Sequence, residues 1–149
     1  ASGLSVMGVG DLLTRLATCC KPVPGDRIIG YITRGRGVTI HRADCPNILA
    51  EDEKERLVSV EWGTSDKQTY PVTIRVEAWD RPGLLRDVTT IVADEKLNIL
   101  ASTTQTRPDE HTAIITVTVE IGSLAELSRL MSKIERVKNV FNVVREIAR

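Results

Sequence analysis

Hydrophobic and polar residues alternate most regularly in the second half of the chain. Val72 to Trp79 and His111 to Ile121 each place every second residue on one apolar side, which predicts two strands with one buried face. Apolar residues at helical spacing follow each of these strands, and Ser123 with Glu126 forms a capping box at the start of the second helix. The predicted elements of this half are strands over 72–79, 97–107, 111–121 and 140–147 and helices that begin at residues 84 and 124.

The order of these elements, β-α-β-β-α-β, is the split βαβ or ferredoxin-like arrangement. It builds a four-stranded sheet with two helices on one face. The other face of the sheet is then free to pair with something else. The second half is therefore predicted to be one domain that mixes helices with an antiparallel sheet.

The first half has shorter and less regular segments. Apolar residues at helical spacing predict a helix from Gly8 to Cys19. Lys21-Pro22 ends this helix, because proline disfavours the helical region for the residue before it. The β-rich runs 28–33 and 38–41 flank a Gly35-Arg36-Gly37 turn and predict a hairpin.

A short helix over 46–53, with Pro46 in its first turn, and a strand over 57–62 complete the first half. The stretch 63–68 contains no hydrophobic residue and marks a boundary between modules. The predicted fold class is α+β, with a small αββαβ module over 5–63 followed by a ferredoxin-like βαββαβ domain over 69–149.

Composition excludes several classes of protein. Lys plus Arg and Asp plus Glu each number 20, so contact with a polyanion needs a local patch of charge. Aromatic residues make up 3% of the chain, too few for an ordinary base-stacking surface, and no apolar run approaches the length of a membrane span. Three cysteines, two of them adjacent, make a poor disulfide framework, so we expect a reducing, cytoplasmic compartment. The Ala-Ser-Gly start indicates a cut end and a fragment of a longer protein.

Two short blocks hold all three cysteines and one of the two histidines. Cys19 and Cys20 form one pair, and His41 with Cys45 forms the other. Zinc takes four thiolate or imidazole ligands, often as two close pairs, so these four side chains are candidate metal ligands. Adjacent cysteines diverge along a helix or a strand, however, and Asp44 could replace one of them. The alternative is a small module with buried, reduced cysteines and a hydrogen-bonded histidine.

The sequence Asp80-Arg81-Pro82-Gly83-Leu84-Leu85 follows the first strand of the second half and opens a helix. Pro82 and Gly83 at a helix start leave several backbone N–H groups free, which suits a carboxylate. Gly83 also has no side chain to block the approach of a ligand. The alternative interpretation is a turn that only caps the helix.

A β-α-β-β-α-β unit with this Arg-Pro-Gly loop resembles an ACT domain, an amino-acid-sensing regulatory module. Together with the Cys19-Cys20 block and the block from His41 to Asn47, the chain resembles the C-terminal regulatory region of long RelA/SpoT-type stringent-response proteins. These proteins make, and often hydrolyse, the alarmone (p)ppGpp. The resemblance covers residues 5 to 149 and implies a zinc-finger or RIS-like module, an ACT domain and no catalytic residue. The parent chain would be a GTP pyrophosphokinase or (p)ppGpp hydrolase.

The resemblance also implies partners and sites. It implies contact of the first module with ribosomal RNA and tRNA, for which the candidate residues are Lys21, Arg34, Arg36 and Arg42. The alternative is that these cations belong to a solvated hairpin.

For the ACT domain the resemblance implies a ligand held by Asp80 and Asn98, next to Pro82, Gly83, Leu84 and Leu85. The apolar neighbours Leu84, Leu85 and Ile99 favour a branched-chain amino acid. A homodimer through the ACT domain is expected, because it would cover strand or helix edges.

Two other functions stay open from the sequence. One is an amino-acid-sensing ACT tail of an unrelated metabolic enzyme, although such a tail has no reason to carry the two cysteine blocks. The other is an enzyme with a Cys–His nucleophile pair, for which no third orienting group is evident.

Overall fold

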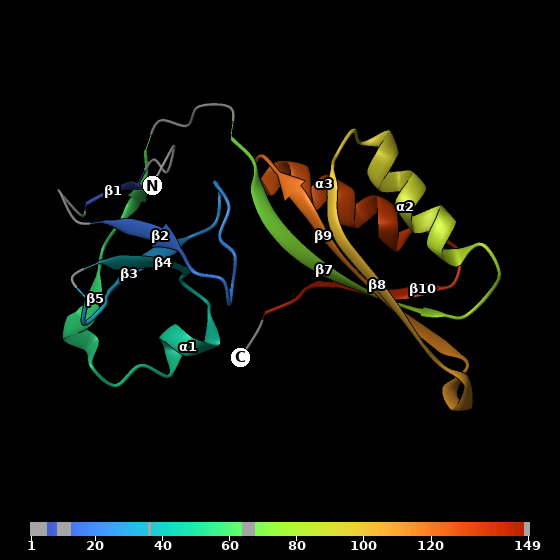
Figure 1. Ribbon diagram of the computed structural model, residues 1–149, viewed down its shortest axis with the longest axis horizontal. Coiled ribbons are helices and arrows are strands. Elements are labelled where there is room, and N and C mark those ends of the chain that lie inside the picture. Colours follow the sequence, from blue (N-terminus) through green and yellow to red (C-terminus); the bar gives the residue numbers. More distant parts are fainter. Residues whose placement is uncertain (1–5, 9–12, 36, 64–67, 148–149) are drawn as a thin grey trace. The chain divides into compact units, whose positions relative to one another are not determined.

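The computed structural model describes residues 6–8, 13–35, 37–63 and 68–147 of the chain. The backbone separates into two compact units, one formed by Ala1–Gln68 with Ile147–Arg149 and the other by Thr69–Glu146. The strands of each unit pair only within that unit (Figure 1), and both units bury hydrophobic residues. None of the helices in the described ranges is long and apolar enough to cross a membrane.

The second unit has the predicted ferredoxin-like order. Its strands are β7 (Tyr70–Trp79), β8 (Ile99–Arg107), β9 (Thr112–Ile121) and β10 (Val140–Arg145). They lie in the order β10-β7-β9-β8, and every neighbouring pair is antiparallel. The helices α2 (Leu84–Asp94) and α3 (Leu124–Glu135) cover one face of this sheet, and a short 3-10 turn η2 (Pro108–Glu110) joins β8 to β9 (Figure 1).

The core of the second unit follows from the alternation in the sequence. Every second residue of β9 from Ala113 to Ile121 is buried, and β7 buries the matching positions from Val72 to Ala78. The helices supply residues from one stripe each, so that the apolar side of the sheet is closed. The buried helix residues are Leu84, Val88, Val92, Leu127, Leu130 and Ile134.

Local polar contacts fix both helices. Ser123 caps α3 by accepting a hydrogen bond from the Glu126 N–H at 3.3 Å, as the capping box predicts. The Glu126 carboxylate accepts from the N–H of Gly122 at 2.7 Å, one residue earlier than the motif implies. Glu95 at the end of α2 accepts from Lys133 and from Arg129, the latter at 2.8 Å, and Lys133 followed by Arg129 lowers the pKa of the Glu95 carboxyl.

The first unit is a small four-stranded sheet with short connections. Its strands β2 (Thr14–Leu16), β3 (Ile28–Ile32), β4 (Val38–Arg42) and β5 (Leu57–Val58) lie in the order β2-β4-β3-β5, and β1 (Val6–Met7) pairs with β6 (Glu61–Trp62). A one-turn helix α1 (Pro46–Leu49) and a 3-10 turn η1 (Lys54–Arg56) follow the hairpin. The β3–β4 hairpin is as predicted, with Ile32 opposite Val38.

The predicted helix from Gly8 to Cys19 is wrong where the structure describes it, since Thr14–Leu16 is a strand parallel to β4. Leu16 packs against the Val38 and Ile40 cluster, whereas Ala17 belongs to the cluster of Cys20 and Cys45. Adjacent residues that serve opposite faces require an extended backbone. Residues 9–12, which contributed to the helical pattern, lie outside the described residues.

Two further elements are shorter than predicted. The helix over 46–53 ends at Leu49, although Pro46 does occupy its first turn. The strand over 57–62 is divided between β5 and β6, which belong to different sheets. Short segments of this kind have too few residues for hydrophobic periodicity to set their ends.

Candidate functional site

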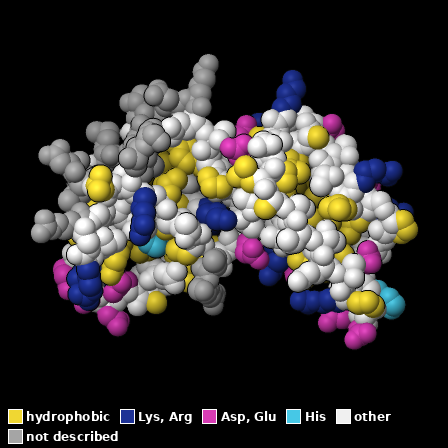
Figure 2. All heavy atoms as spheres, viewed as in Figure 1, with side chains coloured by type: hydrophobic (Ala, Val, Ile, Leu, Met, Phe, Trp, Pro, Cys, Tyr) yellow, Lys and Arg dark blue, Asp and Glu magenta, His cyan; other side chains and the backbone are white. Residues whose placement is uncertain are grey.

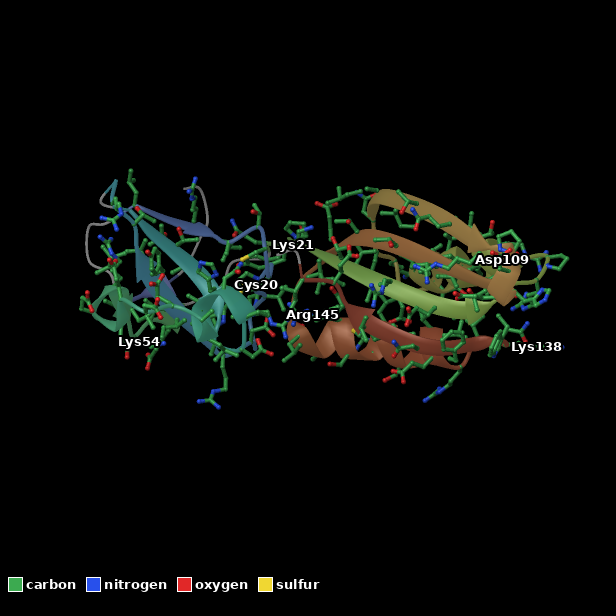
Figure 3. All side chains as sticks on the ribbon, turned by 90° about the horizontal axis from the view of Figure 1, so that it is seen from below. Cys20, Lys21, Lys54, Asp109, Lys138 and Arg145 are labelled. Atoms are coloured by element: carbon green, nitrogen blue, oxygen red, sulfur yellow. The ribbon has the colours of Figure 1, made fainter. Side chains whose placement is uncertain are left out.

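A turn, the end of a strand and the start of a helix bring the cysteines and the histidine together. Cys19 and Cys20 lie in the turn after β2, where the Lys21 N–H donates to the Ala17 carbonyl at 3.1 Å and Lys21 adopts a left-handed φ of 46°. His41 is on β4, and Cys45 is the residue just before α1. Cys20 lies at one end of the unit, away from Lys54 (Figure 3). Adjacent side chains diverge on a regular helix or strand, and the tight turn instead lets both Cys19 and Cys20 approach His41.

The distances within this group match those of a tetrahedral site. The Cys19 sulfur lies 3.5 Å from His41 Nδ1 and 3.7 Å from the Cys45 sulfur, and the Cys20 sulfur lies 3.7 Å from the same His41 nitrogen. All four ligand atoms lie within 4.8 Å of one another. Tetrahedral zinc with ordinary bond lengths separates two sulfurs by roughly 3.8 Å and a sulfur from a nitrogen by roughly 3.6 Å. The donor set therefore fits a four-coordinate zinc ion.

Burial controls the protonation of these ligands. It raises the pKa of the Cys20 thiol to about 12, and the neighbouring Cys45 and Cys19 add to this rise while the Arg42 N–H opposes it. Burial also lowers the pKa of His41, which keeps the imidazole in the neutral form that binds metal. A metal ion would displace the thiol protons. Three thiolates and one imidazole leave no open position, so the chemistry is that of a structural site.

Arg42 and Asp44 lie next to candidate ligands in the sequence but have other contacts. The backbone N–H of Arg42 donates to the Cys20 sulfur at 3.2 Å, which orients that sulfur. The Arg42 side chain pairs with Asp44 at 2.8 Å, and the Asp44 side chain is 67% exposed. Asp44 therefore lies outside the cluster of candidate ligands.

The Asp80–Leu85 loop is held by charged side chains at the start of α2. Gly83 precedes the helix with a left-handed φ of 78°, a conformation that favours glycine. Arg81 bonds Asp87 at 2.8 Å and the carbonyl of Lys138 at 3.1 Å, and Arg81 followed by Arg86 lowers the pKa of the Asp87 carboxyl. The Leu84 N–H donates to the Arg81 carbonyl at 3.4 Å, and the guanidinium groups of Arg81 and Arg86 both pair with Asp87 beside the start of α2.

The predicted loop residues differ in exposure. Asp80, Pro82 and Leu85 are exposed, whereas Leu84 is 4% exposed and packs in the core, so it offers no wall to a ligand. Asp80 donates its backbone N–H to the His111 carbonyl at 2.9 Å.

Asn98 is not near this loop. Its amide donates to Glu120 at 2.7 Å, beside the beginning of β7, whereas the loop follows the end of β7. Because β7 and β8 both run antiparallel to β9, the start of β8 and the end of β7 lie at opposite ends of the sheet. The seven steps from Val72 to Trp79 span roughly 23 Å at strand spacing. Asp109 and Lys138 mark the end at which β7 finishes (Figure 3).

Comparison with known protein families accounts for both units. Residues 4–63 match the RelA/SpoT RIS domain, and residues 66–145 match the ACT domain. The chain belongs to the ACT domain family and carries a RelA/SpoT RIS domain before the ACT domain. The unit of β7–β10 is thus the ACT domain, and the unit with the Cys/His cluster is the RIS domain.

The same two domains recur together in curated relatives. The chain is 44% identical over 142 residues to a GTP pyrophosphokinase of Escherichia coli K12. The aligned stretch covers 94% of this chain and 19% of the relative. It is 44% identical over 144 residues to the bifunctional (p)ppGpp synthase/hydrolase RelA of Mycobacterium tuberculosis, over 96% of this chain and 19% of the relative. The chain therefore spans about a fifth of the length of these relatives and corresponds to their C-terminal part. A solved ACT domain from GTP pyrophosphokinase of Chlorobium tepidum aligns with 52% of this chain and 97% of its own, at 21% identity and a TM-score of 0.47.

The cations predicted to contact RNA are not gathered in one patch of the RIS domain. Arg34 is 78% exposed but approaches Glu53 at 3.5 Å, Arg42 is 14% exposed and paired with Asp44, and Lys21 is half-buried. Arg36 lies outside the described residues. In the view of Figure 2, the Lys and Arg side chains of this domain form separate spots.

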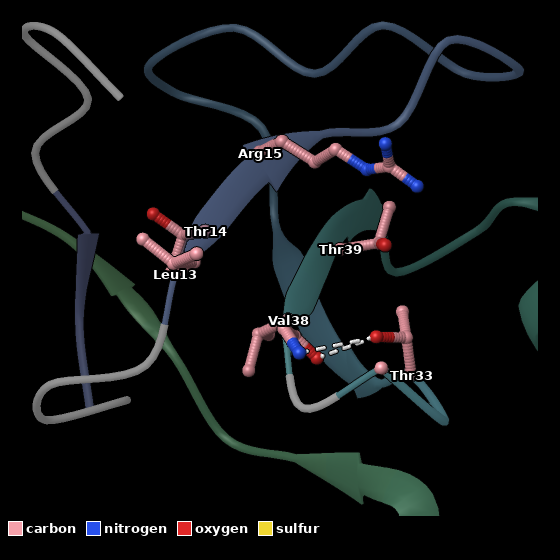
Figure 4. A pocket seen from close by; sticks show the side chains of 8 residues that line it. Leu13, Thr14, Arg15, Thr33, Val38 and Thr39 are labelled. Atoms are coloured by element: carbon pink, nitrogen blue, oxygen red, sulfur yellow. Dashed lines mark hydrogen bonds between the residues drawn. The ribbon is translucent and has the colours of Figure 1, made fainter.

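Arg15 is a cation that the sequence analysis missed. It is exposed on β2 opposite Thr39 of β4, and both side chains border a hollow of about 220 Å³ that also has Thr33, Gly35 and Gly37 in its wall (Figure 4). A second hollow of about 260 Å³ begins at the same two side chains and reaches Cys19 and His41. Arg15 was missed because the sequence analysis predicted a helix over this segment. Only the extended backbone of residues 14–16 places Arg15 beside Thr39.

Proposed function

We propose that this chain is the C-terminal regulatory part of a bifunctional (p)ppGpp synthetase/hydrolase, a GTP pyrophosphokinase of the stringent response, with catalysis performed by the parent chain outside residues 1–149. The observation that carries the proposal is the presence of a RIS domain and an ACT domain in one stretch, at 44% identity to such enzymes over 94% of this chain. An ACT tail of an unrelated metabolic enzyme would not account for the RIS domain. In this role the RIS domain contacts ribosomal RNA and tRNA and holds zinc. The ACT domain forms a homodimer and senses an amino acid.

Contact with RNA is supported by the surface around Arg15. Arg15 makes no ion pair or hydrogen bond within the described part of the chain, so its charge is available to a phosphate. Threonine hydroxyls and the glycine backbone of the β3–β4 turn line the neighbouring hollow. Cations, hydroxyls and backbone N–H groups are the donors that bind nucleic-acid phosphates. Arg34 would add charge from the β3–β4 turn and Lys21 from the turn after β2, with Arg42 as a minor contributor because it is paired.

We expect Arg15→Glu to weaken binding of the full chain to bacterial ribosomes and to lower the slope of log affinity against log salt by about 1. The reason is the loss of one phosphate contact and the addition of a repulsive carboxylate. Filter binding between 50 and 200 mM salt measures both quantities. Arg107→Glu on the ACT domain is the matched control and should leave the slope unchanged. Equal affinity and equal slope for wild type and Arg15→Glu would contradict an RNA surface at this hollow.

Self-association of the ACT domain is supported by β8. This strand is at the edge of the sheet, and nearly all of its residues are exposed. An unpaired strand edge favours pairing with another chain. If two β8 strands pair antiparallel about a two-fold axis, the beginning of one β8 meets the end of the other. Asn98 of one chain then approaches the end of the sheet that carries the Asp80–Leu85 loop of the second chain, which one chain alone does not achieve.

We expect valine or isoleucine to bind this dimer with modest affinity, because a small ligand buries little surface. The ligand carboxylate would meet the N–H groups of Gly83 and Leu85, since the Leu84 N–H already donates to the Arg81 carbonyl, and Leu85 would contact the ligand side chain. Isothermal titration with either amino acid, combined with sedimentation of the protein, measures binding and dimerisation together. Asn98→Ala should weaken both.

Two variants control this titration. Asn142 resembles Asn98 in that its side-chain amide donates to a glutamate, here Glu77 at 2.7 Å. The Asn142→Ala variant should therefore bind the amino acid as the wild type does. Gly83→Val should abolish binding, since a β-branched residue is strained at a left-handed φ. A monomer at all concentrations, or wild-type binding by Gly83→Val, would leave the loop as a helix cap only.

A further inference from the structure

The three cysteines of the RIS domain differ in access to solvent. Cys20 is 1% exposed and Cys45 is fully buried, whereas Cys19 is partly exposed. Cys19 also borders the hollow of about 260 Å³ that opens beside Arg15 and Thr39. A small polar molecule that enters this hollow therefore reaches the Cys19 sulfur first.

Cys19 has one suitable partner for a disulfide. Its sulfur lies 3.7 Å from that of Cys45, so a rotation of the two side chains can bring them to the bond length of about 2.05 Å. Cys20 is unsuitable, because adjacent residues in a trans chain have Cα atoms about 3.8 Å apart, below the usual disulfide range that begins at about 4.4 Å. The Cys20 sulfur is also held by the Arg42 N–H at 3.2 Å.

We propose that Cys19 is an oxidation site, and that a hydroperoxide converts Cys19 and Cys45 into a disulfide. In the first step the Cys19 sulfur attacks the peroxide, an S–O bond forms and the O–O bond breaks, leaving a sulfenic acid and releasing an alcohol, or water from hydrogen peroxide. In the second step the Cys45 sulfur attacks the Cys19 sulfur, an S–S bond forms and the S–O bond breaks, releasing water. Two thiols and one hydroperoxide thus give one disulfide, one alcohol and one water.

The disulfide has a direct consequence for the metal centre. It removes two of the four donors, and Cys20 with His41 cannot complete a tetrahedral site alone. Oxidation therefore releases any bound zinc, and reduction by a dithiol restores the ligand set. The proposal itself depends only on the sulfur positions, so the metal-free protein tests it even if zinc does not bind.

The experiment treats the full chain with hydrogen peroxide, both metal-free and loaded with zinc, and then alkylates the free thiols. Trypsin leaves Cys19 and Cys20 together in the peptide 16–27 and Cys45 in the peptide 43–54, because the bond between Lys21 and Pro22 resists cleavage. Fragmentation of the linked peptides by mass spectrometry then identifies the cysteine that is joined to Cys45. The expected result is a Cys19–Cys45 disulfide with Cys20 alkylated, and one zinc ion released for each disulfide in the loaded sample.

Two variants test separately which cysteine forms the disulfide with Cys45. Cys20→Ser should still form the Cys19–Cys45 disulfide, whereas Cys19→Ser should form no intramolecular disulfide. Dithiothreitol should restore the alkylation of both cysteines. A disulfide that contains Cys20, or three cysteines that stay alkylated in full after peroxide treatment, would overturn the proposal.

Discussion

The wild-type chain is expected to bind one zinc ion, and the Cys20→Ser protein is expected to bind no stoichiometric zinc. Serine cannot supply the sulfur that lies 3.7 Å from His41 Nδ1, and three donors do not close a tetrahedral structural site. Structural zinc contributes about 10–16 kcal/mol of binding free energy in small domains, so the loss should destabilise the RIS domain strongly. Metal analysis after gel filtration and thermal melting measure the two effects. Cys45→Ser should behave in the same way.

Asp44→Ala is the matched control for this result. Asp44 is also next to Cys45 in the sequence, but its exposed carboxylate pairs with Arg42. The variant should keep full zinc content and nearly wild-type melting. Full zinc content in the double variant Cys20→Ser/Cys45→Ser would exclude this metal centre, and metal-free wild-type protein with unchanged melting would make the cysteines packing residues.

The Leu130→Ala protein is expected to lose about 2–5 kcal/mol of the free energy of unfolding of the ACT domain. Leu130 is fully buried between α3 and the sheet, so truncation removes apolar contacts and leaves a cavity. Urea denaturation followed by circular dichroism measures the change in midpoint at constant slope. Zinc content should be unchanged, because the RIS domain is a separate compact unit.

Leu100→Ala is the control for the same substitution at an exposed site. The Leu100 side chain is 52% exposed, beside the register shift at the start of β8, so its truncation should change stability by less than about 0.5 kcal/mol. An equal loss for the two variants would mean that the α3 face is not the core of this domain.

The sequence predicts the ACT domain well because its elements are long. β7 and β9 each have ten residues, enough for the alternation to identify one buried face, and Ser123 defines the start of α3 through a local hydrogen bond. These features depend on neighbours in the chain. The structure brings the four candidate metal ligands within 4.8 Å of one another, and their role as metal ligands stays a prediction.

The remaining features depend on pairing between distant segments. The strand β2 forms because its backbone bonds to β4, a contact that hydrophobic spacing over 8–19 does not encode. Arg15 was missed for that reason. The separation of Asn98 from the Asp80–Leu85 loop depends on strand order and direction, so a motif that places both in one pocket of one chain does not follow from the sequence.

Under the proposed function, this separation would make ligand binding and dimerisation two parts of one equilibrium. If the amino-acid site needs the loop of one chain and Asn98 of another, a monomer has only half a site, and two ligands are bound for each dimer. Each ligand must then tighten the dimer by the same free energy by which the dimer tightens the ligand. The apparent affinity for the amino acid would rise with protein concentration, so the cellular abundance of the protein would set the amino-acid level to which it responds.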